Sequence, residues 1–152
     1  MEFRELNKND IPSLLELYVQ LNDENVGFDI EKARDVWTRE IEDNKNIHYF
    51  GAVENGKVVS TCYCVIIPNL TRGCQPICFI ENVVTHKDFR KQGLGRKVID
   101  MAVEEARRNN CFKVILQSGS GRKEAHKFYE GLGFAGDTKK AFDMRLSDGV
   151  NK

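Results

Sequence analysis

Glycines and cations are combined in one short stretch of this sequence, in an order suited to holding an anion. The stretch reads Arg90-Lys91-Gln92-Gly93-Leu94-Gly95-Arg96, and it follows a long apolar segment. Glycine lets a phosphate approach the backbone, and the first turn of a helix offers unpaired N–H groups at the positive end of its dipole. A strand that leads through this loop into a helix therefore predicts a phosphate or pyrophosphate site.

Two well-known phosphate-binding loops do not match this stretch. A Walker A loop closes with Gly-Lys-Ser/Thr, whereas Gly95 is followed by Arg96. The dinucleotide-binding fingerprint needs a third glycine at the position that Val98 occupies. An ordinary strand-to-helix turn, with glycines for steric reasons, stays the alternative.

A second feature is a carboxylate inside an apolar strand. Glu81 lies in the segment Phe79-Ile80-Glu81-Asn82-Val83. Burial of a carboxylate costs free energy, so such a residue usually has a partner or a function. Glu81 is therefore a candidate general base, and the alternative is a solvated residue on an open face of the strand.

The cysteines do not indicate a metal centre. The chain has five of them, at positions 62, 64, 74, 78 and 111, and the first residues form no apolar signal segment, so we expect reduced thiols. Their spacing is not that of a zinc ribbon or finger, and cysteines in strands are commonly small core residues. We therefore expect no metal.

Composition bounds the class of protein. The 152 residues predict a single domain, residues 1–152. Lys plus Arg number 23, as do Asp plus Glu, and this balance argues against a nucleic-acid-binding surface. No apolar run is long enough to span a membrane. We therefore expect a cytoplasmic location and no membrane partner.

The elements that must position these residues follow from hydrophobic periodicity and turn signals. Asn55-Gly56 predicts a tight hairpin, and Asp10 is a candidate helix N-cap. The resulting order is βααβββαβαββ, a mixed α/β (α+β) fold with one sheet. The expected strands cover residues 1–6, 48–53, 58–67, 77–86, 112–117, a short segment near 134, and 141–146, and the expected helices cover 11–23, 29–41, 93–108 and 122–131.

Two motifs in this order resemble a known family. Arg90, Gly93 and Gly95 match the pattern Arg/Gln-x-x-Gly-x-Gly/Ala, and the segment from Ala125 to Phe134 matches Ala-x-x-Phe-Tyr-x-x-x-Gly-Phe. Together they resemble the GNAT superfamily of acyl-CoA-dependent N-acyltransferases. The resemblance implies a single central sheet that is mixed, mostly antiparallel, and splayed.

The resemblance also implies a cofactor site for acetyl-CoA. Its pyrophosphate would lie on the backbone N–H groups of residues 91–96, and its pantetheine arm would pair like a strand with Val83, Val84 and Thr85. The loop that leads to Ala125 would contact the far side of that arm. Many family members have Asn where this chain has Arg122, which could instead contact a phosphate or cap the site. The implied cofactor-binding residues are Val83, Val84, Thr85, Arg90, Lys91, Gln92, Gly93, Leu94, Gly95, Arg96, Arg122 and Ala125.

The implied chemistry is acetyl transfer by direct attack of an amine. The amine must lose a proton, the oxyanion needs donors, and the departing thiolate is helped by a proton. The resemblance gives Tyr129 the role of acid, because a tyrosine is protonated at neutral pH. Without the motif, Tyr129 would be interpreted as a core aromatic. Glu81 would act on the amine, directly or through water, and a backbone N–H of residues 83–85 would bind the oxyanion.

The acceptor is expected to be a small primary amine, such as a polyamine or an amino sugar. Carboxylates in the loop of residues 22–29 could attract a cationic amine, and a solvated loop with a helix cap at Asp29 is the alternative. Arg72 would instead suit a phosphate or carboxylate on the acceptor. Two segments, residues 80–84 and 111–116, resemble the glucosamine-phosphate N-acetyltransferases. A protein or peptide amine, or a non-catalytic acyl-CoA-binding module, stays as an alternative. Similar proteins are often dimers, so the analogy allows a homodimer.

Overall fold

The computed structural model describes residues 1–21 and 27–146. Within it the chain forms two compact units, Met1–Ile115 and Leu116–Lys152. The carboxylates expected to attract an amine at positions 23 and 24 lie outside the described residues. None of the described helices is long and apolar enough to cross a membrane.

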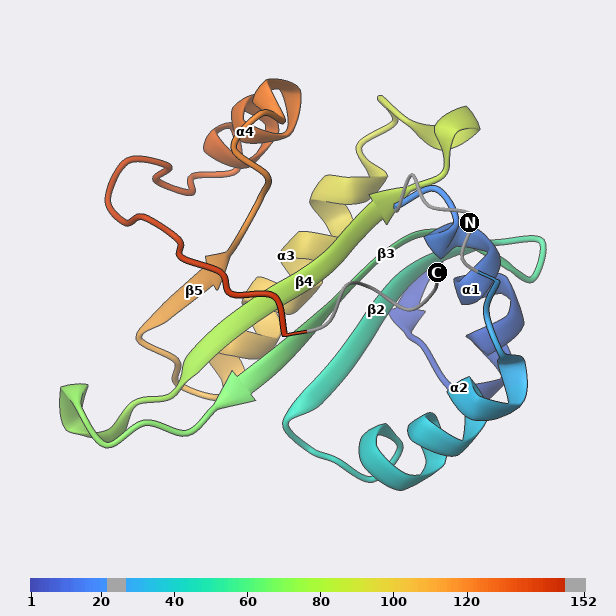
Figure 1. Ribbon diagram of the computed structural model, residues 1–152, viewed down its shortest axis with the longest axis horizontal. Helices are drawn as coiled ribbons and strands as arrows, with labels where there is room; N and C mark the ends of the chain where they lie inside the picture. Colours follow the sequence, from blue (N-terminus) through green and yellow to red (C-terminus); the bar gives the residue numbers. More distant parts are fainter. Residues whose placement is uncertain (22–26, 147–152) are drawn as a thin grey trace. The chain divides into compact units, whose positions relative to one another are not determined.

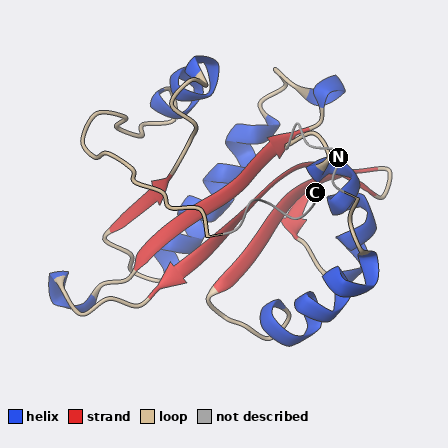
Figure 2. Ribbon diagram, in the orientation of Figure 1, coloured by secondary structure: helices blue, strands red, loops and turns tan. Residues whose placement is uncertain are grey.

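One five-stranded sheet organises the first unit (Figures 1 and 2). Its strands follow in chain order, and the pairs β1–β2, β2–β3 and β3–β4 are antiparallel. The last pair is parallel, which makes the sheet mixed and mostly antiparallel as predicted. The strands are β1 (Glu2–Glu5), β2 (Ile47–Glu54), β3 (Lys57–Ile67), β4 (Ile77–Thr85) and β5 (Lys113–Leu116).

The predicted hairpin joins β2 to β3. Glu54 pairs with Lys57, and the two residues between them have positive φ, 50° at Asn55 and 75° at Gly56. A two-residue turn of this kind requires left-handed backbone at both positions, which Asn and Gly adopt at little cost. The turn fixes the register between these two neighbouring strands.

Helices cover both faces of this sheet. α1 (Ile11–Tyr18) and α2 (Ile30–Val36) precede β2, and a π-helix, Trp37–Ile41, replaces the last part of the predicted second helix. α3 (Leu94–Arg108) packs on the other face, where the Cys62 thiol donates to the carbonyl of Val98. Figure 1 shows α3 behind β3 and β4.

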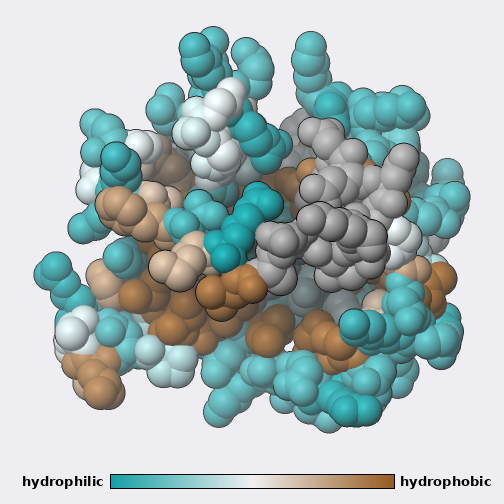
Figure 3. Space-filling view, in the orientation of Figure 1, coloured by the Kyte–Doolittle hydropathy of each residue, from teal (hydrophilic) through white to brown (hydrophobic). Residues whose placement is uncertain are grey.

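The face of the sheet turned away from α3 carries apolar and aromatic side chains. Figure 3 views the molecule from the side opposite α3 and shows hydrophobic atoms beside hydrophilic ones. Because side chains alternate along a strand, Tyr63, next to Cys62, points to this face. α1 covers part of it, and Leu17 of that helix belongs to a buried cluster with Val58 and Val84 of the sheet.

Asp10 anchors the start of α1, although not as the predicted helix cap. It occupies the N-cap position, but its side chain makes no capping bond to α1. Its carboxylate instead accepts two hydrogen bonds from Arg4, both of 2.7 Å, and a third from the N–H of Asn7 at 2.9 Å. The Arg4 guanidinium holds the pKa of Asp10 below its usual range. This contact ties β1 to α1.

The second unit contains α4 (Lys123–Glu130) and the chain that follows it. The prediction of two further strands after this helix is wrong for residues 131–146, which form turns and loop (Figure 2). Apolar residues do alternate there, but the side chains of Phe142, Met144 and Leu146 are 84–92% exposed. Alternation produces a strand only where a neighbouring strand pairs with its backbone, and this segment has none among the described residues.

Candidate active site

The phosphate-binding loop predicted from the sequence connects β4 to α3. A 3-10 turn, Lys87–Phe89, follows β4, and two left-handed residues, Lys91 (φ 60°) and Gly93 (φ 78°), then lead into the helix. Gly93 is the N-cap of α3, and a Cβ built on it would meet no atom within 4 Å. Leu94 is buried and fixes the first turn to the core, while Arg90, Lys91 and Gln92 are exposed.

Electrostatics at this end of α3 suit an anion. The first turn contains no acidic residue. The N–H of Lys97 bonds to the carbonyl of Gly93 at 3.2 Å, so the N–H groups of Leu94 and Gly95 come before the first backbone bond of the helix. These N-terminal donors and the space above Gly93 fit a pyrophosphate.

The polar side chains around the loop point in different directions. Arg90 Nε donates to the carbonyl of Thr85 at 3.2 Å, which holds its guanidinium beside the end of β4. Gln92 Nε2 donates to the carbonyl of Asp88 at 3.4 Å. On the first turn of the helix, Lys97 lies with its ammonium 4.6 Å from the centre of the Phe3 ring, so a cation–π contact directs it toward β1.

Glu81 lies at the end of a row of side chains that crosses three strands. Tyr49 of β2 pairs with Tyr63 of β3, and Tyr63 pairs with Glu81 of β4. The two tyrosine rings stack, with centroids 4.8 Å apart and an angle of 14° between their planes. Burial, and then the charge of Glu81, raise the pKa of Tyr63. The candidate base therefore faces an aromatic surface on the side of the sheet that α1 shares.

A bulge in the β3–β4 pairing follows Glu81 directly. The register changes between Thr61, which pairs with Val84, and Tyr63, so that Asn82 and Val83 together face Cys62. Asn82 has a φ of 50°, in the left-handed region. A bulge of this kind re-aims side chains and bends the strand. The sequence prediction missed it, although Asn is one of the few residues that tolerate this backbone.

The residues predicted to pair with the pantetheine arm follow the bulge. Val84 is buried, whereas Val83 and Thr85 are half-buried. Thr85 Oγ1 and Ser60 Oγ lie within hydrogen-bonding distance, 2.8 Å, which fixes the end of β4. Glu81, the segment 83–85 and the loop 90–96 thus belong to one strand–loop–helix unit, as the sequence predicts.

The remaining predicted site residues belong to the second unit. Tyr129 is half-buried on α4, and its ring contacts those of Phe128 and Phe134, at centroid distances of 5.3 and 6.3 Å. Arg122 is the N-cap of α4 and makes no side-chain cap bond, and Ala125 is half-buried. His126 Nε2 lies 2.8 Å from the carbonyl of Gly119, a contact that fastens the preceding loop to the helix.

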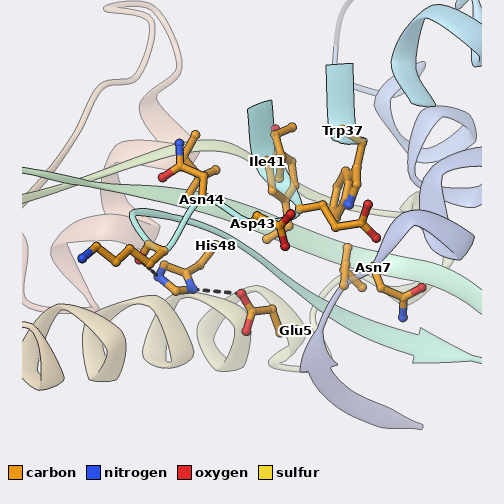
Figure 4. Close-up of a pocket in the computed structure, with 12 residues that line it drawn as sticks. Glu5, Asn7, Trp37, Ile41, Asp43, Asn44 and His48 are labelled. Carbon is orange, nitrogen blue, oxygen red and sulfur yellow. Dashed lines mark hydrogen bonds and ion pairs between the residues drawn. The ribbon is translucent and has the colours of Figure 1, made fainter. Parts of the chain in front are cut away.

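A cavity of about 410 Å³ lies elsewhere in the first unit (Figure 4). The π-helix, the turn after it and the start of β2 line it, and its lining residues include none of the predicted catalytic or cofactor-binding residues. In Figure 4, His48 points toward Glu5, whose carboxylate lies 2.8 Å from His48 Nδ1. The chemistry predicted from the sequence therefore does not coincide with this cavity.

Three of the five cysteines lie in the core of the described chain. Cys62, Cys64 and Cys78 are fully buried and unbridged, and burial raises the pKa of Cys62. Residues 1–21 and 27–146 contain no group of three or more His, Cys, Asp or Glu that could hold a metal ion.

Comparison with known proteins gives a consistent picture. A family model described as the acetyltransferase (GNAT) family matches residues 12–134. Glucosamine 6-phosphate N-acetyltransferase of Trypanosoma brucei brucei is 32% identical over 148 residues, which cover 96% of this chain and 95% of the relative.

Solved structures share the fold. A putative acetyltransferase from Agrobacterium tumefaciens str. C58 has a TM-score of 0.88 and 39% identity, and the match covers 95% of this chain and 99% of that one. Glucosamine-6-phosphate N-acetyltransferase from Arabidopsis thaliana has a TM-score of 0.82 and 25% identity, with 97% of each chain covered.

Proposed function

Because the chain belongs to the GNAT family of acetyltransferases and is an N-acetyltransferase that uses acetyl-CoA, we propose that its acceptor is a primary amine of a small molecule. When bound, acetyl-CoA supplies the acetyl group as a thioester. The observation that carries the proposal is the position of Glu81 on β4, one bulge before the strand leads to the N-terminal N–H groups of α3. The proposed base and the proposed pyrophosphate site therefore lie on one continuous segment.

Each predicted residue has a role in this proposal. Glu81 takes the proton of the amine, directly or through one water, because an alkylammonium has no lone pair with which to attack. Tyr129 gives a proton to the departing thiolate, as a tyrosine that is protonated at neutral pH can do. A backbone N–H of residues 83–85 donates to the developing oxyanion.

The cofactor-binding roles are divided in the same way. The N–H groups of residues 91–96 and the side chain of Arg90 hold the pyrophosphate. Residues 83–85 pair with the pantetheine arm, and Arg122 and Ala125 are further proposed cofactor-binding residues. The match of the family model to residues 12–134, which include parts of both units, supports the proposal that residues 1–152 act as one domain.

Amino sugars are one group of acceptors within this class. The relatives from Trypanosoma brucei brucei and Arabidopsis thaliana carry the name glucosamine 6-phosphate N-acetyltransferase. In this chain Arg72 lies near Phe112, with its guanidinium carbon 5.9 Å from the ring centre. A protein or peptide amine is the competing acceptor, and a cytoplasmic location and a homodimer stay predictions.

The experiment is acetyl-CoA turnover by the purified chain, measured as release of free thiol, across a panel of amines. The panel contains amino sugars with and without a phosphate, polyamines, and peptides with a free N-terminus or lysine. Turnover with small amines and none with peptides is the expected result. Turnover with peptides alone would identify a protein acetyltransferase, and tight CoA binding without any turnover would identify a non-catalytic binding module.

A further inference from the structure

Tyr18, at the end of α1, has a buried hydroxyl without a hydrogen-bond partner in the described part of the chain. The residue is only 9% exposed. A buried hydroxyl that gives up water without gaining a partner costs free energy, so native proteins retain few of them, and those few need an explanation. Neither the proposed catalytic residues nor the cofactor site uses this group.

The hydroxyl faces the bulge of β4. Burial raises the pKa of Tyr18, and the neighbouring Tyr49 and Tyr63 raise it further. The side chain of Asn82, which lies close to the hydroxyl without forming a hydrogen bond to it, lowers the pKa. Burial keeps the hydroxyl in its neutral form. Tyr18 and Asn82 thus present one hydroxyl and one amide, both uncharged and both able to donate and to accept.

The bulge brings Asn82 to the same face of the sheet as Glu81. In a regular strand, neighbouring side chains point to opposite faces. Here Glu81 acts on Tyr63 and Asn82 acts on Tyr18, and both tyrosines lie on the side that α1 shares. The left-handed backbone at Asn82 accompanies this change of direction. A neutral polar pair therefore adjoins the carboxylate that is proposed to receive the proton of the amine.

We propose that Tyr18 and Asn82 are specificity-determining residues that bind a hydroxyl group on the carbon next to the reacting amine. The acceptor class is then a vicinal amino alcohol, which includes amino sugars. A neutral donor–acceptor pair matches a hydroxyl, whereas a phosphate or a second ammonium would need a charged partner. This inference rests on the proposed function, because it concerns the acceptor of the same acetyl transfer.

The test compares two acceptors that differ by one group, trans-2-aminocyclohexanol and cyclohexylamine. The wild-type chain is expected to show a kcat/KM about tenfold higher for the amino alcohol, the value of roughly one hydrogen bond. Tyr18→Phe removes the hydroxyl alone and is expected to lower kcat/KM for the amino alcohol about tenfold, through KM, with no change for cyclohexylamine. Asn82→Gly, which tolerates the positive φ, is expected to act in the same way.

Stability separates this role from a structural one. Because the Tyr18 hydroxyl is unpartnered in the described chain, Tyr18→Phe is expected to leave the melting temperature unchanged or to raise it. Tyr49→Phe is the matched control, since it makes the same chemical change on a nearby tyrosine. The ring of Tyr49 stacks on that of Tyr63, and the proposal does not use its hydroxyl. Tyr49→Phe is expected to leave the ratio of kcat/KM for the two acceptors unchanged.

Two outcomes would overturn the inference. One is equal kcat/KM for the two acceptors in the wild-type chain, and the other is a Tyr18→Phe variant that loses both activities equally together with thermal stability. In either case acetyl transfer to amines would still be observed, and the proposed function would stand. Absence of turnover with every small amine would instead overturn the proposed function itself.

Discussion

Tyr63 and Glu81 lie directly opposite each other on the antiparallel strands β3 and β4. The charge of Glu81 adds to the effect of burial in raising the pKa of Tyr63, so the phenol is a neutral neighbour of the carboxylate. Directly opposite residues on one face are the closest side chains that two strands can offer. The position of the candidate base therefore depends on the pairing of β3 with β4.

Replacement of Glu81 tests its role as the base. Glu81→Gln is expected to lower kcat at neutral pH by about 10²- to 10⁴-fold, the usual contribution of a general base. The affinity for CoA should stay within about twofold, since the loop that binds the pyrophosphate is untouched. Steady-state kinetics and calorimetric titration with CoA measure the two quantities. As pH rises and the free amine replaces the ammonium, the deficit is expected to shrink, and a variant with wild-type kcat at neutral pH would rule out the assignment.

Replacement of Arg90 tests the pyrophosphate site. Arg90→Ala is expected to weaken CoA binding by about tenfold, because a charge-assisted contact with a phosphate is lost, while kcat at saturating acetyl-CoA changes little. Lys97→Ala removes the same charge from a residue that lies over Phe3 and serves as the control. Titration of both variants with CoA at low and high salt should show a salt-dependent loss of CoA affinity for Arg90→Ala alone. Equal losses of CoA affinity in the two variants would mean that the overall positive charge of the region, and not a contact of Arg90, binds the pyrophosphate.

Replacement of Tyr129 tests the proposed acid. Tyr129→Phe keeps the ring that contacts Phe128 and Phe134 and removes only the hydroxyl. We expect kcat to fall by about 10²-fold and the dissociation constant of CoA to stay nearly constant. An acceptor-independent loss in kcat is expected, because the thiolate leaves in every reaction. If CoA affinity fell in step with activity, Tyr129 would be a binding residue instead.

The Arg4–Asp10 pair predicts how stability depends on pH. The pKa of Asp10 is lower in the folded chain than in the unfolded chain, so the stabilisation is complete above the unfolded value of about 3.9 and is lost as pH falls below it. Asp10→Asn is expected to cost about 2 kcal/mol of unfolding free energy at pH 7, measured with urea, and progressively less in acid. The exposed pair of Arg34 and Glu31 provides the control, since Glu31→Gln is expected to cost less than about 0.5 kcal/mol. A loss of stability for Asp10→Asn that does not depend on pH would contradict the role of this ion pair.

Local signals in the sequence were sufficient for most of the elements. Asn55-Gly56 predicts the hairpin correctly because its turn needs no distant contact. The glycines of residues 90–96 likewise predict the turn that leads into α3. The alternating residues 142–146 misled the prediction, because a strand also requires a neighbour that the sequence cannot show.

The parts of the site that were missed depend on contacts between distant segments. Tyr18 reads as an ordinary core residue of an amphipathic helix, and only the fold brings its hydroxyl to Asn82, far along the chain. The bulge at Asn82 arises from the register between β3 and β4, which the sequence of one strand alone does not determine. Likewise, the cation–π contact of Lys97 with Phe3 requires β1 and α3 to be in place.

The most direct test of acetyl transfer to a small amine follows the acetyl group itself. The purified chain is incubated with acetyl-CoA labelled in the acetyl group and with an amino sugar, and the product is analysed by nuclear magnetic resonance. We predict that the label appears as an amide on the amine nitrogen, at a rate that falls in the Glu81→Gln variant. Label found only as free acetate, or as an ester on a hydroxyl, would contradict acetyl transfer to the amine.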